Sequence, residues 1–170
     1  MNAIFTSTLD TNVGPFTVMV DADGAVLAAG WTAQPADLLP QVHPDLRGES
    51  VARKDLGPAS RAARAYHDGD LSAPDAVAVR QQTDGPFLAA AWQVLRKVAP
   101  GEPVSYTELA TRTGNPRANR AAAQACARNA AALFVPCHRV IRTDGSLGGF
   151  RWGVDVKRWL LSHESAHDQP

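Results

Sequence analysis

Several features are scarce in these 170 residues: there are two cysteines, aromatic side chains make up 6%, and neither sign of charge is in excess, with 17 Lys+Arg and 17 Asp+Glu. The longest apolar run, 130–135, is far shorter than the ~20 residues that a membrane span needs. The N-terminus lacks the basic and apolar regions of a secretory signal, so we expect a cytoplasmic protein. This composition indicates a soluble globular chain of one domain or two small ones.

The balanced net charge conceals an asymmetry along the chain. Residues 1–85 carry 6 basic and 11 acidic side chains, whereas residues 86–170 carry 11 and 6. Between Arg112 and Arg151 there are seven arginines and one acid, Asp144. Such a patch favours a polyanionic partner, although a solvated surface would explain it equally well.

The first half predicts a small domain that contains a sheet. Residues 16–20 and 25–29 are apolar runs around a Gly-containing turn, which predicts a hairpin. Prolines make 34–57 rich in loops, 58–67 predicts a short helix, and 71–83 predicts a strand. His43 and His67 have no Cys or His neighbours at ligand spacing, so we interpret both as surface histidines.

After residue 85 the pattern becomes helical. Apolar side chains at three-and-four spacing predict a helix from Phe87 to Val98. Ser105, followed three residues later by Glu108, forms a capping box for a helix that ends at Gly114. Pro116 is expected to open another helix, through Asn129. Two short helices in this order are typical of a helix-turn-helix, although a packed core helix would have a similar sequence.

The most informative segment places a cysteine beside a histidine, Cys137-His138. A thiolate is the reactive form of cysteine, and neighbouring positive groups favour it, so this pair is a candidate activated nucleophile. A buried cysteine beside a structural histidine is the alternative. The terminal helix adds Glu164, a carboxylate that could orient the histidine as in a triad. Cys126 and Cys137 are expected to remain free thiols in a reducing compartment.

Residues 136–140, Pro-Cys-His-Arg-Val, resemble the active-site signature of the O6-alkylguanine-DNA alkyltransferase family. The resemblance extends over 86–170 and includes Ser105-Tyr106, Gly114-Asn115-Pro116, Arg120, Asn129, Gly145, Gly153 and the terminal Leu160–Glu164. Residues 1–85 are similar only in general layout. The resemblance implies an α/β (α+β) protein with an N-terminal cap domain, 1–85, and a helical alkyltransferase and DNA-binding domain with a winged helix-turn-helix, 86–170.

The same resemblance implies roles for individual residues. Cys137 would take the alkyl group from O6-alkylguanine in double-stranded DNA, in one irreversible step, with O4-alkylthymine as a possible second substrate. His138 would act as the base through one water, and Glu164 would hold His138. Tyr106 would donate a proton to the departing guanine, and Asn129 would steady the surrounding turns. Each protein molecule would then act once, as a monomer.

Two further sets of residues follow from the resemblance. The implied DNA-binding residues are Arg120, which would enter the base stack, with Arg117, Arg128, Ala121, Ser105, Arg139 and Arg151. The implied substrate pocket comprises Tyr106, Val135, Pro136, Phe150, Arg151 and Trp152. Phe150-Arg151-Trp152-Gly153 departs from the Tyr-Ser-Gly-Gly of many members, and an indole at this position is expected to narrow the pocket.

Neither a metal nor a cofactor is expected, because residues 1–85 contain no cysteine and therefore do not match the family's zinc-binding type. Two alternatives remain. A non-catalytic alkyltransferase-like protein would bind alkylated DNA, but such proteins replace the cysteine. A Cys-His hydrolase of unrelated fold would turn over repeatedly and would leave the arginine cluster unexplained.

Overall fold

The computed structural model describes residues 2–167, which form two compact units. The N-terminal unit contains residues 2–82 together with Ala130–Phe134, and the C-terminal unit contains the other described residues. The chain thus leaves the first unit near the boundary predicted after Gly85, and one later segment returns to it. Within the described range, no helix has both the length and the apolar character required to cross a membrane.

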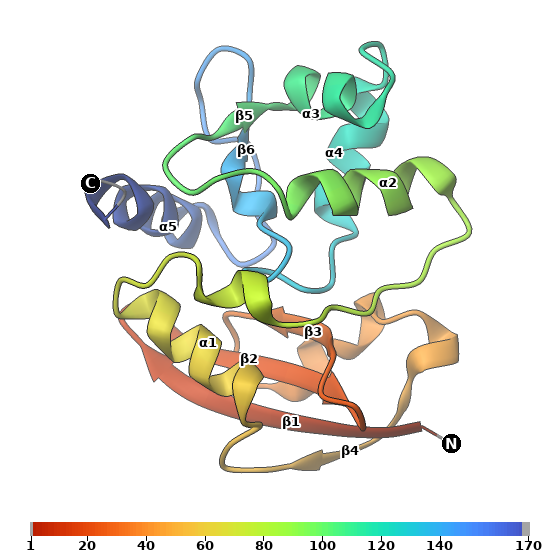
Figure 1. The fold of residues 1–170 in the computed structure, drawn as a ribbon, viewed down its shortest axis with the longest axis vertical. Helices are drawn as coiled ribbons and strands as arrows, with labels where there is room; N and C mark the ends of the chain where they lie inside the picture. The colour runs from red at the N-terminus through yellow and green to blue at the C-terminus, as the bar shows by residue number, and fades with distance from the viewer. Residues whose placement is uncertain (1, 168–170) are drawn as a thin grey trace. The chain divides into compact units, whose positions relative to one another are not determined.

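A mixed four-stranded sheet forms the N-terminal unit (Figure 1). Antiparallel pairs join β1 (Asn2–Thr11) to β2 (Gly14–Asp21) and β2 to β3 (Val26–Gly30), while β4 (Gly48–Ala52) runs parallel to β1. The predicted hairpin is confirmed as β2 and β3. In its turn, the carboxylate of Asp21 accepts hydrogen bonds from the backbone N–H groups of Asp23 and Ala25, at 2.9 and 3.0 Å. This Asx-type turn fixes the strand register locally.

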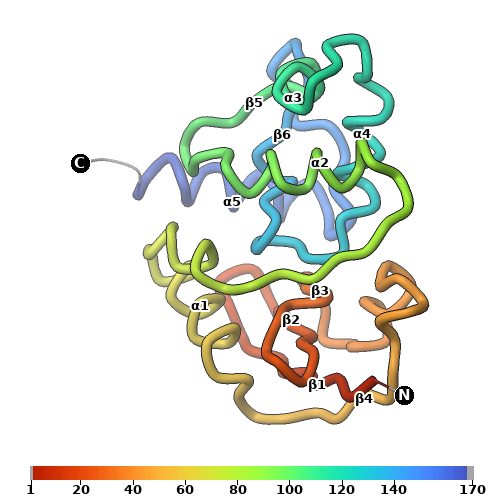
Figure 2. Tube along the Cα trace, turned by 45° about the vertical axis from the view of Figure 1, so that its right-hand side comes forward, coloured from red at the N-terminus to blue at the C-terminus, as the bar shows by residue number. Residues whose placement is uncertain are grey.

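Helix α1 (Pro58–His67) packs on β1 and β2, as Figures 1 and 2 show, and confirms the predicted helix. The surface position expected for His67 is wrong, because its side chain is buried against Phe16. Its Nε2 accepts a hydrogen bond from the indole of Trp31 at 3.3 Å, and its Nδ1 bonds to the carbonyl of Ala63 at 2.7 Å. A neutral imidazole satisfied at both nitrogens can be buried at low cost.

The strand predicted over 71–83 is wrong. That segment contains a 3-10 turn, η4 (Ala73–Ala76), and a single bridge from Val79 to Val26. Pro74 lies in this turn and has no backbone N–H to donate to a neighbouring strand, so the segment does not pair as a strand there. The segment 34–57, predicted to be rich in loops, contains three further 3-10 turns, η1 (Pro35–Asp37), η2 (Leu39–Gln41) and η3 (Pro44–Leu46), and also the strand β4.

The returning segment, Ala130–Phe134, binds to β3. The backbone N–H of Ala29 donates to Ala130 at 2.9 Å, and that of Ala132 donates to Ala29 at 3.2 Å. Every residue of the segment is buried. The fifth strand position on this sheet is therefore occupied by residues that lie just before the signature in the sequence, an arrangement that local patterning did not predict.

Four helices dominate the C-terminal unit: α2 (Pro86–Leu95), α3 (Tyr106–Thr113), α4 (Asn119–Ala127) and α5 (Val154–His167). A short parallel pair, β5 (Val104–Ser105) and β6 (Val140–Ile141), joins them, with a 3-10 turn, η5 (Cys137–Arg139), before β6. Helices α2, α3 and α4 pack on one another, and the indole of Trp92 donates to the carbonyl of Ala125 at 3.0 Å. A sheet-containing N-terminal part and a helical C-terminal part confirm the expected fold class.

The helix-turn-helix geometry follows from its capping residues. The Ser105 hydroxyl accepts a hydrogen bond from the backbone of Glu108 at 3.0 Å and caps α3, which ends at Gly114 in the left-handed region. Helix α4 begins at Asn119 rather than at Pro116 as predicted. Asn115 explains the difference, because its side chain and its carbonyl accept hydrogen bonds from the next residues and hold Pro116 in a turn.

Candidate active site

Cys137 follows a tight backbone turn centred on Pro136. Pro136 has φ −82° and ψ 65°, and the backbone N–H of Cys137 donates to the carbonyl of Val135 at 2.8 Å. These values define an inverse γ-turn, for which the proline ring already sets φ. The turn places Cys137 at the start of η5, where the residue is 8% exposed and therefore buried.

Asn129 stabilises this turn from the end of α4. Its buried amide donates to the carbonyl of Val135 at 2.7 Å, the same carbonyl that Cys137 uses. Burial raises the pKa of the Cys137 thiol, whereas the hydrogen bond from Asn129 and the charge of Lys157 lower it, and burial prevails. The resting sulfur is therefore a protonated thiol that requires a base.

His138 is fully buried and bonded to Glu164. Its Nε2 lies 2.7 Å from Oε2 of Glu164. Burial would raise the pKa of Glu164, but its hydrogen bonds with His138 and Arg139 and the charge of Arg139 outweigh burial and hold that pKa well below its usual range. Since an ionised carboxylate only accepts hydrogen bonds, Nε2 of His138 carries the proton. The Nδ1 atom is then left with a lone pair.

That lone pair is available for proton transfer. Burial lowers the pKa of His138 in spite of Glu164, so the ring is neutral near neutral pH. Its Nδ1 is buried and has no hydrogen-bond partner among the described residues. A buried ring nitrogen without a protein partner, on the residue that follows Cys137 in the chain, is a candidate general base.

Arg139 was expected to contact DNA, but the structure buries it. Its guanidinium donates two hydrogen bonds to Glu164, both 2.9 Å, and one to the carbonyl of Val98 at 2.7 Å. Arg139 is therefore the countercharge that keeps Glu164 ionised while His138 stays neutral. The sequence did not indicate this, because an arginine beside a histidine in a basic segment has the pattern of a surface cation.

Sequence reasoning missed Lys157, which is 1% exposed in α5. Its ammonium group donates to three carbonyls, those of Val140 at 2.8 Å, Gly149 at 3.3 Å and Leu147. Lys157 therefore fixes the loop after β6 and places a positive charge that lowers the pKa of Cys137. The only signal in the sequence is its position on the apolar side of α5, between Val156 and Leu160.

An open cavity of about 570 Å³ lies in the C-terminal unit. It is lined by Tyr106, Asn119, Arg120, Ala123, Arg142, Thr143, Gly148 and Gly149. Tyr106 and Arg120, both predicted site residues, therefore share one cavity. Burial, followed by the charges of Cys126 and Cys137, raises the pKa of Tyr106 to about 12, so its hydroxyl remains protonated.

Other predicted pocket residues lie outside this lining. Val135 and Pro136 are buried, Phe150 and Trp152 are half-buried, and the guanidinium of Arg151 lies 5.2 Å from the centroid of the Trp152 ring. The lining includes instead Gly148 and Gly149, which have no side chain, and a Cβ atom at Gly148 would lie 3.2 Å from the Tyr106 oxygen. A role for Trp152 in narrowing the pocket therefore stays a prediction.

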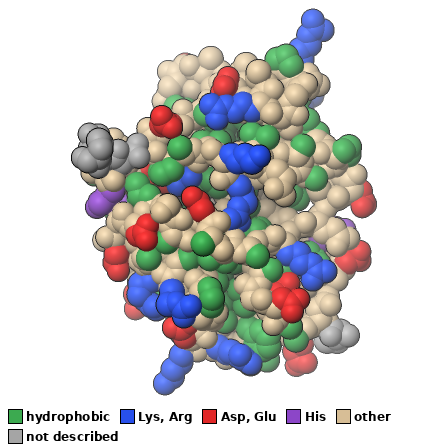
Figure 3. Space-filling view, in the orientation of Figure 1, with side chains coloured by type: hydrophobic (Ala, Val, Ile, Leu, Met, Phe, Trp, Pro, Cys, Tyr) green, Lys and Arg blue, Asp and Glu red, His purple; other side chains and the backbone are tan. Residues whose placement is uncertain are grey.

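The remaining predicted DNA-binding residues are accessible to differing degrees. Arg117, Arg120, Arg128 and Arg151 are exposed, while Ser105 and Ala121 are half-buried. On the face presented in Figure 3, basic side chains are interspersed with acidic ones.

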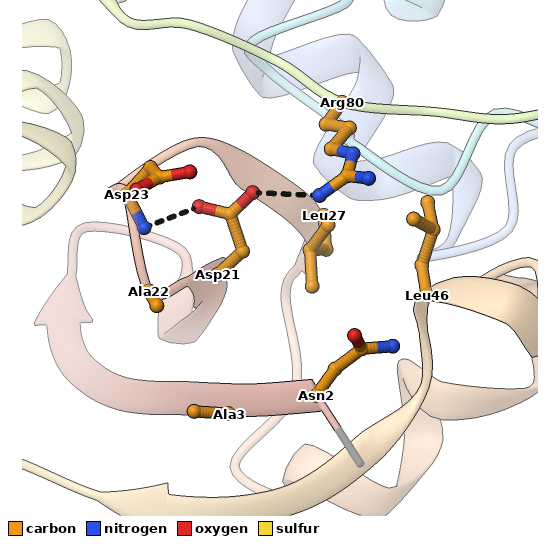
Figure 4. Close-up of a pocket in the computed structure, with 8 residues that line it drawn as sticks. All are labelled: Asn2, Ala3, Asp21, Ala22, Asp23, Leu27, Leu46 and Arg80. Carbon is orange, nitrogen blue, oxygen red and sulfur yellow. Dashed lines mark hydrogen bonds and ion pairs between the residues drawn. The ribbon is translucent and has the colours of Figure 1, made fainter.

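A second, smaller cavity of about 100 Å³ lies in the N-terminal unit (Figure 4). Of the two acidic residues that line it, Asp21 and Asp23, Asp21 accepts a hydrogen bond from the backbone of Asp23 and pairs with Arg80 at 3.5 Å, while Asn2 donates to two backbone carbonyls. These polar groups bond to the protein itself, which indicates a structural cavity. Across residues 2–167, no group of three or more His, Cys, Asp or Glu side chains could hold a metal ion.

Comparison with known proteins identifies relatives of both units. The model of the family described as "6-O-methylguanine DNA methyltransferase, DNA binding domain" matches residues 86–166, which include Cys137, His138 and Glu164. A methylated-DNA–protein-cysteine methyltransferase of Shigella flexneri is 34% identical over 158 residues, covering 91% of each chain.

Two other matches differ in extent. The bifunctional transcriptional activator/DNA repair enzyme Ada of Escherichia coli is 49% identical over 83 residues, which are 49% of this chain and 23% of that protein. This chain thus spans about a quarter of the length of Ada. The solved structure of Mycobacterium tuberculosis OGT in complex with DNA is similar with a TM-score of 0.78 and 27% identity, covering 96% of this chain and 94% of that chain.

Proposed function

This chain belongs to the methylated-DNA–protein-cysteine methyltransferase family, as its signature indicated, and we propose that it repairs double-stranded DNA by moving the methyl group of O6-methylguanine onto its own Cys137. Other small alkyl groups, and O4-alkylthymine, would be secondary substrates. The observation that carries the proposal is the buried thiol of Cys137 next to His138, whose Nε2 is held by Glu164 at 2.7 Å. We also propose that the protein acts as a cytoplasmic monomer.

The transfer requires two proton movements: the thiol of Cys137 loses a proton, and the departing guanine gains one. His138 takes the thiol proton at Nδ1, through one water, and the resulting imidazolium is stabilised by Glu164. The sulfur attacks the methyl carbon, the S–C bond forms and the C–O6 bond breaks. The electron pair stays on the guanine, and Tyr106 donates a proton to it. The products are methylated Cys137 and an unmodified guanine.

The proposed DNA-contacting elements are α4 and the loop after β6. The methyl group of O6-methylguanine is inaccessible to a buried thiol while the base is stacked, so the nucleotide must leave the duplex. Arg120 lines the cavity from α4 and would fill the space that the base leaves. The small side chains of α4, such as Ala121 and Ala123, would permit close approach to the minor groove without reading sequence.

The reaction is expected to be stoichiometric. A methyl thioether offers water no leaving group, so each molecule would accept one methyl group and remain modified. Duplex DNA carrying labelled O6-methylguanine, incubated with increasing amounts of protein, tests this directly. We expect the transferred label to saturate at one methyl group per protein molecule. Sustained release of methanol would instead indicate a hydrolase, and binding without transfer would indicate an alkyltransferase-like binder.

A further inference from the structure

Asn119 is the first residue of α4 and precedes Arg120, and both residues line the cavity. Asn119 is exposed, and the helix carries only alanines between Arg120 and Gln124. Asn119 therefore has the only uncharged polar side chain in the first turn of α4. The transfer described above gives this side chain no role.

The amide of Asn119 is oriented by a hydrogen bond to α3. Its Nδ2 donates to the hydroxyl oxygen of Thr107 at 3.1 Å. That oxygen lies 3.5 Å from the hydroxyl oxygen of Thr143, in the loop after β6. Because the Thr107 oxygen accepts from Asn119, its own hydrogen can be donated to Thr143. This network turns the nitrogen of the amide toward Thr107 before any DNA binds.

The oxygen of the same amide has no protein partner. Oδ1 of Asn119 accepts no hydrogen bond from any residue in the range 2–167. An amide is planar, with its oxygen and its nitrogen on opposite sides of the carbonyl carbon, so the contact with Thr107 leaves Oδ1 directed away from that hydroxyl. An acceptor of set orientation therefore lies at the exposed start of α4, next to Arg120.

We propose that Asn119 recognises the N2 amino group of a guanine in a base pair next to the extruded nucleotide. This inference rests on the proposed function, in which α4 approaches the minor groove and Arg120 fills the space that the base leaves. In the minor groove every base pair presents acceptors, and the N2 amino group of guanine is the only donor. The acceptor Oδ1 therefore favours G·C over A·T at that position, whereas the alanines of α4 do not distinguish them.

Base analogues that change only this amino group provide the test. We compare four duplexes that each carry one O6-methylguanine, in which a flanking base pair is guanine·cytosine, inosine·cytosine, adenine·thymine or diaminopurine·thymine. Inosine lacks the minor-groove amino group of guanine, and diaminopurine adds that group to adenine. Each flank is varied in turn. Single-turnover methyl transfer at protein concentrations below saturation gives a second-order rate constant for each duplex.

The measured quantity is the ratio of the rate constants with and without the amino group for one protein, so a general loss of folded protein in a variant cancels. For wild type we expect a ratio of about threefold or more at one flank, with both pairs of duplexes, the effect of one hydrogen bond. Asn119→Ala should bring this ratio to about one. Thr107→Val should also lower it, because the amide can then turn its nitrogen outward. Gln124→Ala is the matched control, since it removes another exposed amide from α4 and should keep the wild-type ratio.

A wild-type ratio near one at both flanks would overturn the proposal, and so would a ratio that Asn119→Ala leaves unchanged. A preference between G·C and A·T that does not follow the amino group would also overturn it, because the discrimination would then arise outside the minor groove or from the deformability of the DNA. If the wild-type protein transfers no methyl group from any of the four duplexes, the proposed function itself is refuted.

Discussion

The Nε2 atom of His138 lies 2.7 Å from Oε2 of Glu164, and neither side chain is exposed to solvent. This carboxylate also accepts two hydrogen bonds from Arg139. One buried anion therefore fixes the tautomer of the base and neutralises a guanidinium. We therefore expect both the stability of the fold and the proposed reactivity of the Cys137 thiol to depend on Glu164.

Glu164→Gln is expected to impair both properties. The amide keeps the shape of the side chain but leaves Arg139 as a buried cation without a countercharge, which costs about 3–5 kcal/mol of unfolding free energy. Its NH₂ group can also bond to His138 Nε2 and reverse the tautomer, so methyl transfer should fall by about a hundredfold or more. Urea unfolding and single-turnover transfer measure the two effects. Glu108→Gln is the control, since that exposed pair with Arg112 should contribute about 0.5 kcal/mol or less. Equal stability losses in the two variants would refute the buried-pair account.

The pH dependence of methyl transfer follows from two opposite shifts. Burial raises the pKa of Cys137, so the thiolate fraction continues to increase above the pH at which an ordinary cysteine ionises, about 8.5. Burial lowers the pKa of His138, so the base stays neutral on acidification to below about pH 6.5. The rate should therefore rise with pH through neutrality and beyond about 8.5. A profile that levels off near neutral pH would show that Cys137 is already ionised at rest.

Asn129→Ala removes a hydrogen bond from the turn that presents the nucleophile. The carbonyl of Val135 keeps only the N–H of Cys137, and the thiol loses a donor that lowers its pKa. We expect a loss of about 1–3 kcal/mol in unfolding free energy and slower alkylation of Cys137 by iodoacetamide at neutral pH. Asn115→Ala, in the turn before α4, should leave the iodoacetamide rate unchanged. Comparable slowing in both variants would show that Asn129 has no specific effect on the thiol.

Arg120→Ala is expected to reduce the repair rate more than the affinity for DNA. Its proposed role is to keep the target nucleotide extruded from the duplex. Most of the affinity for DNA is expected to come from several arginines and should decrease as the salt concentration rises. Single-turnover rates at saturating protein, together with binding isotherms at several salt concentrations, separate the two quantities. An unchanged rate at saturation would remove Arg120 from the mechanism.

Gly148→Ala should place a methyl group in the cavity, against the side chain of Tyr106. Gly148 has φ +74°, and a Cβ there would lie 3.2 Å from the Tyr106 oxygen. The strain and the displaced hydroxyl should together lower transfer from DNA by about tenfold or more. Gly145→Ala provides the comparison, because Gly145 also has positive φ but no atom lies within 4 Å of its Cβ position. If both variants lose the same activity, backbone strain alone accounts for the effect.

Local patterns predicted the helices and the reactive cluster. Apolar spacing and caps located α1, α2 and α3, and the signature placed the thiol and histidine one residue apart, so their proximity needed no tertiary information. Patterns did not locate β1 and β4, whose parallel pairing joins residues more than forty positions apart. Such pairing is decided by tertiary packing rather than by local preference.

The interior ionic groups were predicted least well. Arg139 and Lys157 are cations, which usually lie at the surface, and each is buried because distant acceptors meet it: Glu164 and Val98 for Arg139, and three loop carbonyls for Lys157. His67 was misplaced for the same reason, since the indole of Trp31 that satisfies it is on another element. A single sequence contains these side chains but does not indicate which distant groups will form hydrogen bonds with them, so their burial could not be predicted.

Cys137, and not Cys126, is the proposed acceptor of the methyl group. Peptide mass mapping after incubation with duplex DNA containing O6-methylguanine tests it most directly, on wild type and on Cys137→Ser. We expect one added methyl group on the peptide that contains Cys137 and none on the peptide that contains Cys126, and we expect the Cys137→Ser protein to stay unmodified while it still binds the duplex. Methylation of Cys126, or of Cys137→Ser at more than a trace, would contradict it.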